Sequence, residues 1–312
     1  MTDALTLPQS TDRWRGALLG TALGDAAGRP FEGRHHIGAD QVEAWLADDA
    51  ELVWSDDTAM TIALARSLIA RTGQVDAQHL GDTFATEYHQ EPWRGYGAGP
   101  PRIFATAAAG TPYLEAAAAL FGGTGSFGNG AAMRAAPVAV AGGDDPDRVA
   151  SLARQQAMVT HAHTLGQDGA ALLALAVWAL ATWPHDDPAR TIGATLRHLD
   201  TDEMRSAAAT ALDLGPDASA TSIARRLGNG VAAVEAVPAA IAAFLGAAGD
   251  AHDVLVRAVT VGGDTDTIAA MAGAMAGAQL GADALPPPLL ARLEARDELI
   301  GLADTLTHVT RR

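Results

Sequence analysis

The stretch VGGDTDTIAAMAGAMAGA, residues 261–278, decides the fold class and contains a candidate site. From Ile268 onwards every residue is apolar or glycine, which predicts a helix buried on all sides. Gly273 and Gly277 lie four residues apart, so we expect a neighbouring helix to approach this face closely. The chain is therefore predicted to be organised around a central helix of small residues.

Polar residues gather at the start of this predicted helix. Asp264, Asp266 and Thr267 fall at its N-cap and first turn, directly after a glycine pair. Capping alone would account for one aspartate there. Two carboxylates and a hydroxyl ahead of a helix without a polar face place an excess of negative oxygen in a buried position, which is costly without a cation. The stretch therefore predicts a metal site.

Composition favours one all-α domain. The chain has 312 residues, 48% hydrophobic but only 5% aromatic, and alanine dominates, which is typical of closely packed helices. No shift in composition and no long linker divides it. We therefore predict a single domain over residues 1–312, with its core at about 14–280.

Charge and missing residue types exclude several function classes. The net charge of −16 argues against general nucleic-acid binding, which depends on clustered basic residues. The absence of cysteine removes disulfides, thiolate metal sites and a thiol nucleophile. All 21 basic residues are arginine, which rules out a Schiff-base lysine and a Walker-A phosphate loop.

Two segments bear on location. Residues 1–10 have neither the basic region nor the long apolar core of a signal peptide. Residues 170–181 are apolar but shorter than the roughly 20 residues that span a bilayer, so we interpret them as a core helix. The expectation is a cytoplasmic monomer without membrane association.

A second acidic cluster repeats the arrangement of the first. Ser55, Asp56, Asp57 and Thr58 stand directly ahead of the apolar segment 59–65. Adjacent aspartates repel each other and raise each other's pKa unless a cation lies beside them. The two clusters lie roughly 200 residues apart in the sequence, and folding can bring two helix starts to one cavity.

The candidate ligands are all oxygens. They are the carboxylates of Asp56, Asp57, Asp264 and Asp266 and the hydroxyls of Ser55, Thr58 and Thr267. Hard oxygen donors select Mg²⁺ or Mn²⁺ over zinc or copper. Four carboxylates balance the charge of two divalent cations, so the expected cofactor is a pair of Mg²⁺ or Mn²⁺ ions.

Together with GALLGTALGD at residues 16–25, these clusters resemble the ADP-ribosylglycohydrolase family, which includes the dinitrogenase-reductase-activating glycohydrolases. The resemblance implies a compact orthogonal bundle of helices around a dinuclear Mg²⁺ or Mn²⁺ centre. It implies cleavage of the glycosidic bond between ADP-ribose and an acceptor, such as a serine or arginine side chain of a protein. The implied partner is therefore an ADP-ribosylated protein or another ADP-ribose-containing substrate.

Residue roles carry over by position from the same resemblance. The implied metal ligands are Ser55, Asp56, Asp57, Asp264, Asp266 and Thr267, and the implied catalytic residues are Glu32, Asp56, Asp57 and Asp266. Glu32 corresponds to the glutamate of a flexible flap that closes near the scissile bond. Ser55 stands where threonine is more usual in the family, but serine keeps the hydroxyl ligand.

Two glycine-rich loops are candidate substrate contacts. Gly97 and Gly99 lie in a loop that can accept phosphate oxygens, although a simple turn explains it equally well. Residues 123–128 match a dinucleotide-binding GxGxxG pattern, but the alanine-rich segment before them is helix-like rather than a strand, which excludes that interpretation. The resemblance instead makes the second loop a diphosphate and ribose site, with contacts at Gly125, Ser126, Asn129 and Gly130.

Aromatic and histidine side chains complete the predicted substrate set. Phe121 and Phe127 can flank an adenine ring, or can equally be core residues. His161 and His163 lie two residues apart, which fits a turn between helices rather than one helix face. The pattern around them resembles the branch of the family that removes ADP-ribose from serine, which makes His161 a predicted substrate contact.

Two other functions fit the same residues at this stage. An oxygen-ligated dinuclear centre also serves hydrolases of other nucleotides or phosphoesters. A catalytically silent relative that binds ADP-ribose or has a structural role would keep the same scaffold. Product analysis separates the three, because only the first releases free ADP-ribose.

Overall fold

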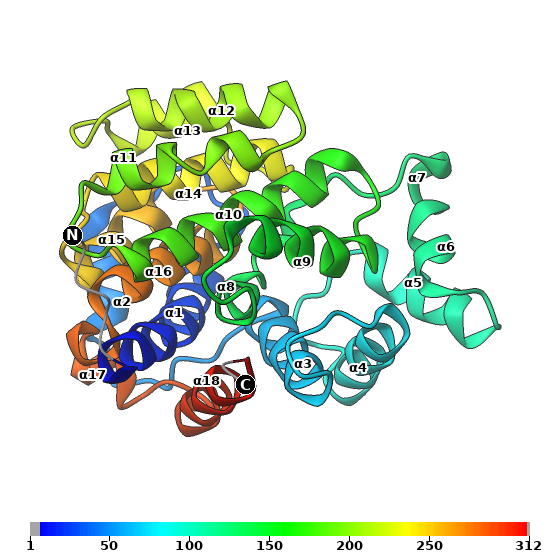
Figure 1. Ribbon diagram of the computed structural model, residues 1–312. Helices are drawn as coiled ribbons and strands as arrows, with labels where there is room; N and C mark the ends of the chain where they lie inside the picture. Colours follow the sequence, from blue (N-terminus) through cyan, green and yellow to red (C-terminus); the bar gives the residue numbers. More distant parts are fainter. Residues whose placement is uncertain (1–6, 311–312) are drawn as a thin grey trace.

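The computed structural model describes residues 7–310, which fold into helices joined by short loops (Figure 1). The α-helices are α1 (Leu7–Gly28), α2 (Ala39–Ala47), α3 (Asp56–Ala70), α4 (Ala77–Gln90), α5 (Gly99–Ala108), α6 (Tyr113–Ala118), α7 (Leu120–Gly123), α8 (Ala136–Ala141), α9 (Pro146–Met158), α10 (Thr164–Thr182), α11 (Pro188–Gly193), α12 (Asp202–Asp213), α13 (Ala220–Leu227), α14 (Ala233–Leu245), α15 (Ala251–Thr260), α16 (Thr265–Leu280), α17 (Pro287–Leu290) and α18 (Arg296–Thr310). Short 3-10 turns are η1 (Arg29–Phe31), η2 (Asn129–Ala131), η3 (Leu196–His198) and η4 (Ala282–Ala284). Strand-type pairing within residues 7–310 is limited to two isolated bridges, which confirms the all-α prediction.

Helices α1 and α16 pack backbone against backbone along a glycine seam. Every fourth residue of α1 from position 16 is glycine, and each faces a small residue of α16; the pairs are Gly16 with Gly277, Gly20 with Gly273, Gly24 with Ala269 and Gly28 with Thr265. A Cβ on any of these four α1 glycines would overlap a backbone carbonyl of α16. The predicted close approach at Gly273 and Gly277 is confirmed, and α1 is the helix that makes it.

The pairing along the seam runs antiparallel. The end of α1 therefore lies beside the start of α16, where the Thr265 hydroxyl donates a hydrogen bond to the Gly28 carbonyl at 2.9 Å. Because no side chains separate the two backbones, the acidic start of α16 is held against α1 with little freedom to shift.

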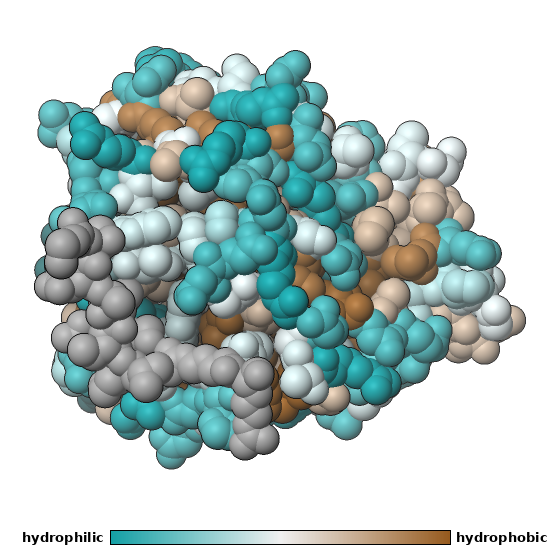
Figure 2. Space-filling view, viewed as in Figure 1, coloured by the Kyte–Doolittle hydropathy of each residue, from teal (hydrophilic) through white to brown (hydrophobic). Residues whose placement is uncertain are grey.

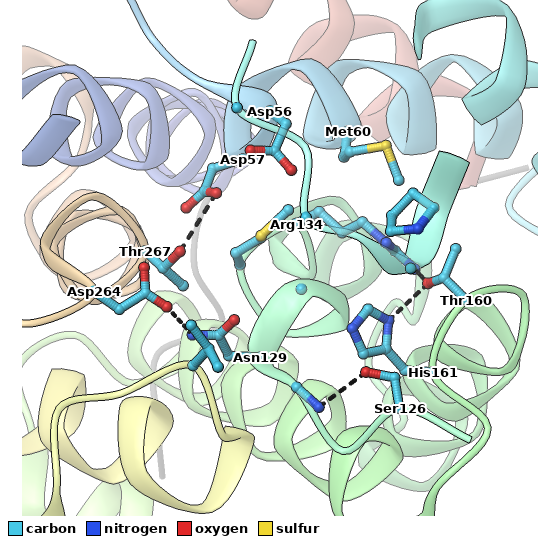
Figure 3. Close-up of a pocket in the computed structure, with 18 of the residues that line it drawn as sticks. Asp56, Asp57, Met60, Ser126, Asn129, Arg134, Thr160, His161, Asp264 and Thr267 are labelled. Atoms are coloured by element: carbon cyan, nitrogen blue, oxygen red, sulfur yellow. Dashed lines mark hydrogen bonds between the residues drawn. The ribbon is translucent and has the colours of Figure 1, made fainter. Parts of the chain in front are cut away.

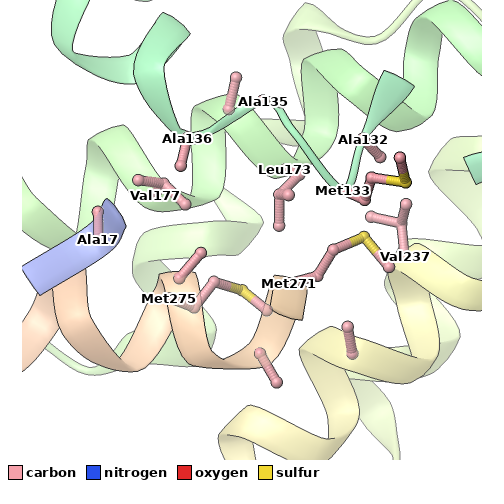
Figure 4. Packing of buried hydrophobic residues seen from close by; sticks show 14 of the residues in the cluster. Ala17, Ala132, Met133, Ala135, Ala136, Leu173, Val177, Val237, Met271 and Met275 are labelled. Carbon is pink, nitrogen blue, oxygen red and sulfur yellow. The ribbon is translucent and has the colours of Figure 1, made fainter. Parts of the chain in front are cut away.

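Helix α10 is the other central element. Leu173 and Val177 of α10 lie near Met271 and Met275 of α16, and all four side chains are fully buried (Figure 4). Within residues 7–310, α10 is the single helix long and apolar enough to cross a membrane, and 83% of its apolar window is buried inside the protein. The prediction of a core helix at residues 170–181 is confirmed.

The segments from α4 to α7 extend to one side of the molecule, at the right of Figure 1. On the same face, hydrophobic surface gathers around α5 and α6 (Figure 2), where Leu114 is exposed. The loop that precedes α5 is hydrogen-bonded to the start of α3, and the loop that follows α7 leads to η2, which packs against α10. They form part of the site described next.

Candidate active site

The two acidic helix starts lie together in the fold, as the sequence predicts (Figure 3). Ser55 is the N-cap of α3, and its hydroxyl accepts a hydrogen bond from the Asp57 backbone N–H. Asp264 is the N-cap of α16, and Asp266 lies in its first turn. The Thr267 hydroxyl, at 3.4 Å from Asp57 Oδ1, joins the two helices. Both positive helix ends therefore point towards one group of carboxylates.

Asp25 holds the start of α3 in place, a role that the sequence reasoning did not assign. It is fully buried in α1 and accepts hydrogen bonds from the Ser55 N–H at 2.8 Å, the Thr58 N–H at 2.9 Å and the Thr58 hydroxyl at 2.6 Å. Burial raises the pKa of this carboxyl. A charged residue within the apolar pattern of α1 is the one sequence feature that could have indicated a role for Asp25. Its hydrogen-bond partners lie thirty or more positions away, so only the fold identifies them.

Glu32 belongs to the loop that follows η1. This loop pairs with the glycine turn before α16, because the Gly33 N–H donates to the Gly263 carbonyl at 2.9 Å and the Gly263 N–H donates to the Arg34 carbonyl at 2.7 Å. Glu32, Asp264 and Asp266 each place one carboxylate oxygen within 4.8 Å of the others. The segment predicted as a flexible flap is therefore tied by backbone hydrogen bonds to the loop that carries Asp264.

Burial and mutual repulsion perturb this group of carboxylates. Burial, followed by the charge of Asp25, raises the pKa of Asp56 to about 7 and that of Asp57 well above its ordinary value. Burial and the neighbouring Asp264 raise the pKa of Asp266 to about 9. The pKa of the more exposed Glu32 is also raised, by burial and then by Asp264.

The donor set fits hard divalent cations. Asp57 Oδ2 is buried and has no hydrogen-bond partner among the described residues, which is a costly arrangement for a carboxylate in a protein interior. The carboxylates of Asp56, Asp264 and Asp266 lie in the same cavity as Asp57, with the Thr267 hydroxyl beside them. Oxygen donors of this kind suit Mg²⁺ or Mn²⁺.

These carboxylates form one end of a cavity of about 350 Å³. Its carboxylate wall consists of Glu32, Asp56, Asp57, Asp264, Asp266 and Thr267, and its loop wall consists of the lining residues within 95–100, 121–134 and 160–161. The predicted contacts that line the loop wall are Gly97, Gly99, Phe121, Ser126, Asn129, Gly130 and His161. The structure thus brings most of the predicted site residues to one cavity.

Gly125, Phe127 and Ser55 are not among the lining residues. Gly125 is buried at a φ of +71°, and an added Cβ would lie 2.8 Å from the His163 backbone nitrogen, so this glycine shapes the loop. The half-exposed Phe127 ring packs edge-on against His163, with the ring centroids 5.9 Å apart. Ser55 is buried, and its hydroxyl caps α3.

Two polar residues of the loop wall are already engaged within the protein. Asn129 donates a hydrogen bond from Nδ2 to Asp264 Oδ2 at 2.6 Å, which ties the loop wall to the carboxylate wall. The Ser126 hydroxyl accepts a hydrogen bond from the Gly128 N–H at 3.2 Å. Both side chains help to hold the 121–130 loop against the cavity.

Arg94 is a second residue that the sequence reasoning did not assign. Its backbone carbonyl accepts a hydrogen bond from the Asp56 N–H at 2.9 Å, and its buried guanidinium lies over the Trp54 ring and pairs with Glu91 and Glu294. This network anchors the loop before α5 to the start of α3. Glu294 lies 200 positions away, so no local pattern reveals the network.

His161 lies in the turn between α9 and α10, as predicted. Its side chain is buried, and burial followed by the charge of Arg134 lowers the pKa of the imidazole to about 3. Arg134 and Thr160, which the sequence reasoning did not single out, also line the cavity. The imidazole is therefore neutral at any physiological pH.

The fold and the site together are an all-helical scaffold with a carboxylate-lined cavity beside glycine-rich loops, an arrangement suited to binding divalent cations. The sequence model of the ADP-ribosylglycohydrolase family matches residues 6–312, so the chain belongs to that family, whose members hydrolyse ADP-ribosyl bonds. The activity depends on metal in this family.

Individual relatives span nearly the whole chain. The protein called ADP-ribosylhydrolase ARH3 in Danio rerio is 38% identical over 94% of this chain and 90% of its own length. The protein of the same name in Homo sapiens is 34% identical over 96% of this chain and 94% of its own. A solved structure titled ADP-ribosylglycohydrolase-related protein complex superposes with a TM-score of 0.72 at 28% identity, covering 97% of this chain and all of that one. The family resemblance inferred from the motifs is confirmed.

Proposed function

We propose that this hydrolase uses two divalent cations, Mg²⁺ or Mn²⁺, to release ADP-ribose from an oxygen-linked acceptor such as a serine side chain. The observation that carries the proposal is the meeting of two acidic helix starts and Glu32 at one end of a single cavity. The choice of an oxygen-linked acceptor is supported by the serine-branch pattern around His161, and the release of ADP-ribose is supported by relatives named ADP-ribosylhydrolase ARH3.

The carboxylate wall would hold the cations. Asp56, Asp57, Asp264 and Asp266 carry enough negative charge for two divalent ions, and the Thr267 hydroxyl lines the cavity beside them. The Ser55 hydroxyl, which caps α3, is an additional candidate ligand. Bound there, the cations would supply Lewis-acid activation of water and orientation of the ribose hydroxyls. The unpartnered Asp57 Oδ2 and the repulsion among these groups support this role.

Glu32 is the residue best placed for proton transfer. Its carboxylate faces the cavity but stays exposed, so a proton taken from the attacking water, or given to the leaving oxygen, can exchange with solvent after each turnover. Asp266 also lines the cavity but is only 5% exposed. Hydrolysis at the anomeric carbon passes through an oxocarbenium-like state, which the nearby carboxylates stabilise.

The loop wall would bind the rest of ADP-ribose. Gly97, Gly99 and Gly130 leave space for phosphate oxygens to approach the backbone, and half of the Phe121 side chain is exposed at the cavity for contact with the adenine. The cavity volume of about 350 Å³ lies within the range of small-molecule sites. The scissile bond would then lie at the carboxylate end.

The decisive experiment measures free ADP-ribose released from serine-linked, arginine-linked and nucleic-acid-linked substrates, with Mg²⁺, Mn²⁺ or a chelator present. We expect metal-dependent release from the serine-linked substrate and its loss in Glu32→Gln. Release from the arginine linkage alone would contradict the proposed acceptor. Release of phosphate or nucleoside instead would favour another nucleotide hydrolase, and calorimetric binding of ADP-ribose without any turnover would favour a silent relative.

A further inference from the structure

The loop wall contains a buried arginine, Arg134, that forms no direct ion pair among residues 7–310. Arg134 is 1% exposed, and its guanidinium lies over the Phe84 ring at 4.4 Å. Its hydrogen bonds run from Nε to Gln156 Oε1 at 2.8 Å and from Nη2 to the Gln156 carbonyl at 3.2 Å and the Thr160 hydroxyl at 2.8 Å. The charge of Asp56 acts on this guanidinium without a direct ion pair, so the buried Arg134 depends on the neutral groups that accept its hydrogen bonds.

The hydroxyl of Thr160 lies between the guanidinium of Arg134 and the imidazole of His161, within hydrogen-bonding distance of both. Thr160 Oγ1 lies 2.8 Å from His161 Nδ1, and both residues line the cavity (Figure 3). A guanidinium only donates hydrogen bonds, so Thr160 Oγ1 is the acceptor for Arg134. The proton of the hydroxyl is then available for a second partner.

Two proton arrangements fit these distances, and burial distinguishes them. If Thr160 donates to His161 Nδ1, the buried hydroxyl and Nδ1 both have a partner, and the proton on Nε2 faces the cavity. If instead His161 Nδ1 carries the proton and donates to Thr160, the buried hydroxyl keeps a proton with no acceptor among its described contacts. An unsatisfied buried donor costs about 1–3 kcal/mol, and a proton on Nδ1 would also face the Arg134 charge. The first arrangement is favoured on both grounds.

We propose that Arg134 and Thr160 are positioning residues that fix His161 in the tautomer with the proton on Nε2, so that the imidazole donates a hydrogen bond to an oxygen of bound ADP-ribose. The Nε2 edge of the ring lies beside Gly128 and Gly130 and is directed into the cavity (Figure 3). No described residue accepts a hydrogen bond from this nitrogen. The identity of the ligand rests on the proposed function, whereas the tautomer does not.

This assignment gives His161 a role different from acid or base catalysis. A neutral imidazole with Nδ1 occupied by a hydroxyl proton can donate from Nε2 but has no free site to accept a proton. The donor is aimed at an oxygen acceptor such as a phosphate or a ribose oxygen. Glycine at positions 128 and 130 keeps the approach open, because a Cβ at position 130 would lie 3.1 Å from Nε2.

The test combines nitrogen NMR of the full chain with binding of ADP-ribose. In the wild-type protein we expect His161 Nδ1 at the unprotonated chemical shift and Nε2 at the protonated one, with Nε2 shifting on addition of ADP-ribose; the signals are assigned by their loss in His161→Gln. Thr160→Val removes the hydroxyl at similar volume and should mix the two tautomers and weaken ADP-ribose binding by about 2- to 10-fold. Thr160→Ser should restore both readouts.

The control is Thr307→Val, which removes another buried hydroxyl, one whose hydrogen bond stays within its own helix, α18. It should change neither the tautomer nor the dissociation constant. Any of three results would overturn the proposal. The first is a proton on His161 Nδ1 in the wild-type protein, and the second is unchanged tautomer populations in Thr160→Val. The third is an Nε2 chemical shift that does not change when ADP-ribose is added. If the protein binds ADP-ribose with the expected Nε2 shift but hydrolyses no linkage, the proposed function is overturned. The positioning of His161 by Arg134 and Thr160 would still be supported.

Discussion

The carboxylate wall and the loop wall face the same cavity but are held by different forces. Behind the carboxylate wall, α1 and α16 meet through glycine, and their backbones set the position of the acidic helix starts. The loop wall is held by polar networks around buried arginines, Arg94 and Arg134. The carboxylate wall thus concentrates negative charge on a rigid base, whereas the loop wall presents backbone amides and neutral side chains around the buried Arg134. Substitutions in each wall can test these differences.

The largest expected effect is at Asp57. Asp57→Asn should lower kcat/KM for ADP-ribose release with Mg²⁺ by roughly 100- to 1,000-fold, because metal activation supplies several kcal/mol of transition-state stabilisation. In a chelator the same variant should unfold at a higher temperature than wild type, since it removes a buried charge that repels its neighbours. Asp297→Asn, on the exposed start of α18, is the matched control. Equal activity with and without the carboxylate would contradict the metal assignment.

The glycine seam should be the most sensitive structural feature. Gly24→Ala places a methyl group against the Ala269 carbonyl and should lower the free energy of unfolding by about 3 kcal/mol, at the upper end of overpacking effects. Gly301→Ala makes the same change in α18, where no atom lies within 4 Å of the new Cβ. That control should gain stability by about 0.5–1 kcal/mol, as alanine does in a helix. Denaturant unfolding of both variants measures the contrast.

Lowering the pH should change the stability that the two walls contribute in opposite directions. The lowered pKa of His161 means that the unfolded chain takes up its proton first, so the stability from this residue is present above pH 6.5 and is lost as the pH falls. The raised pKa of Asp56 or Asp266 has the reverse sign in metal-free protein, because protonation relieves their repulsion. Between pH 7 and pH 5, wild type should therefore lose about 2 kcal/mol more than His161→Gln. Equal losses in urea titrations would show that His161 protonates in the folded state.

The smallest effect compares the two phenylalanines of the 121–127 loop. Phe121 lines the cavity, whereas Phe127 packs against His163 outside it. Phe121→Ala should weaken ADP-ribose binding by about 2- to 10-fold, the magnitude of one aromatic contact. Phe127→Ala should change the dissociation constant by less than about twofold. A larger loss in Phe127→Ala would place the adenine on the other side of the loop.

Local sequence pattern determined the helical class and the chemistry of the carboxylate wall. The apolar run that begins at Ile268 and the polar residues before it belong to the start of one helix, so a local pattern reveals them, because capping and burial act over a few residues. The same holds for Ser55, Asp56 and Asp57 at the start of α3. The two acidic clusters have the same arrangement at a helix start, from which we inferred that they share one cavity. The fold confirms this inference.

Tertiary structure alone decided how the site is supported. Asp25, Arg94 and Arg134 gain their roles from partners 22 to 200 positions away, and no helical or capping pattern encodes such pairs. The same limit applies to the 121–130 loop, where the backbone of the folded loop turned Phe121 into the cavity and left Gly125 and Phe127 outside it. Sequence specifies which groups can do the chemistry because reactivity belongs to the side chain. Their separation and orientation depend on long-range packing, which only the folded chain fixes.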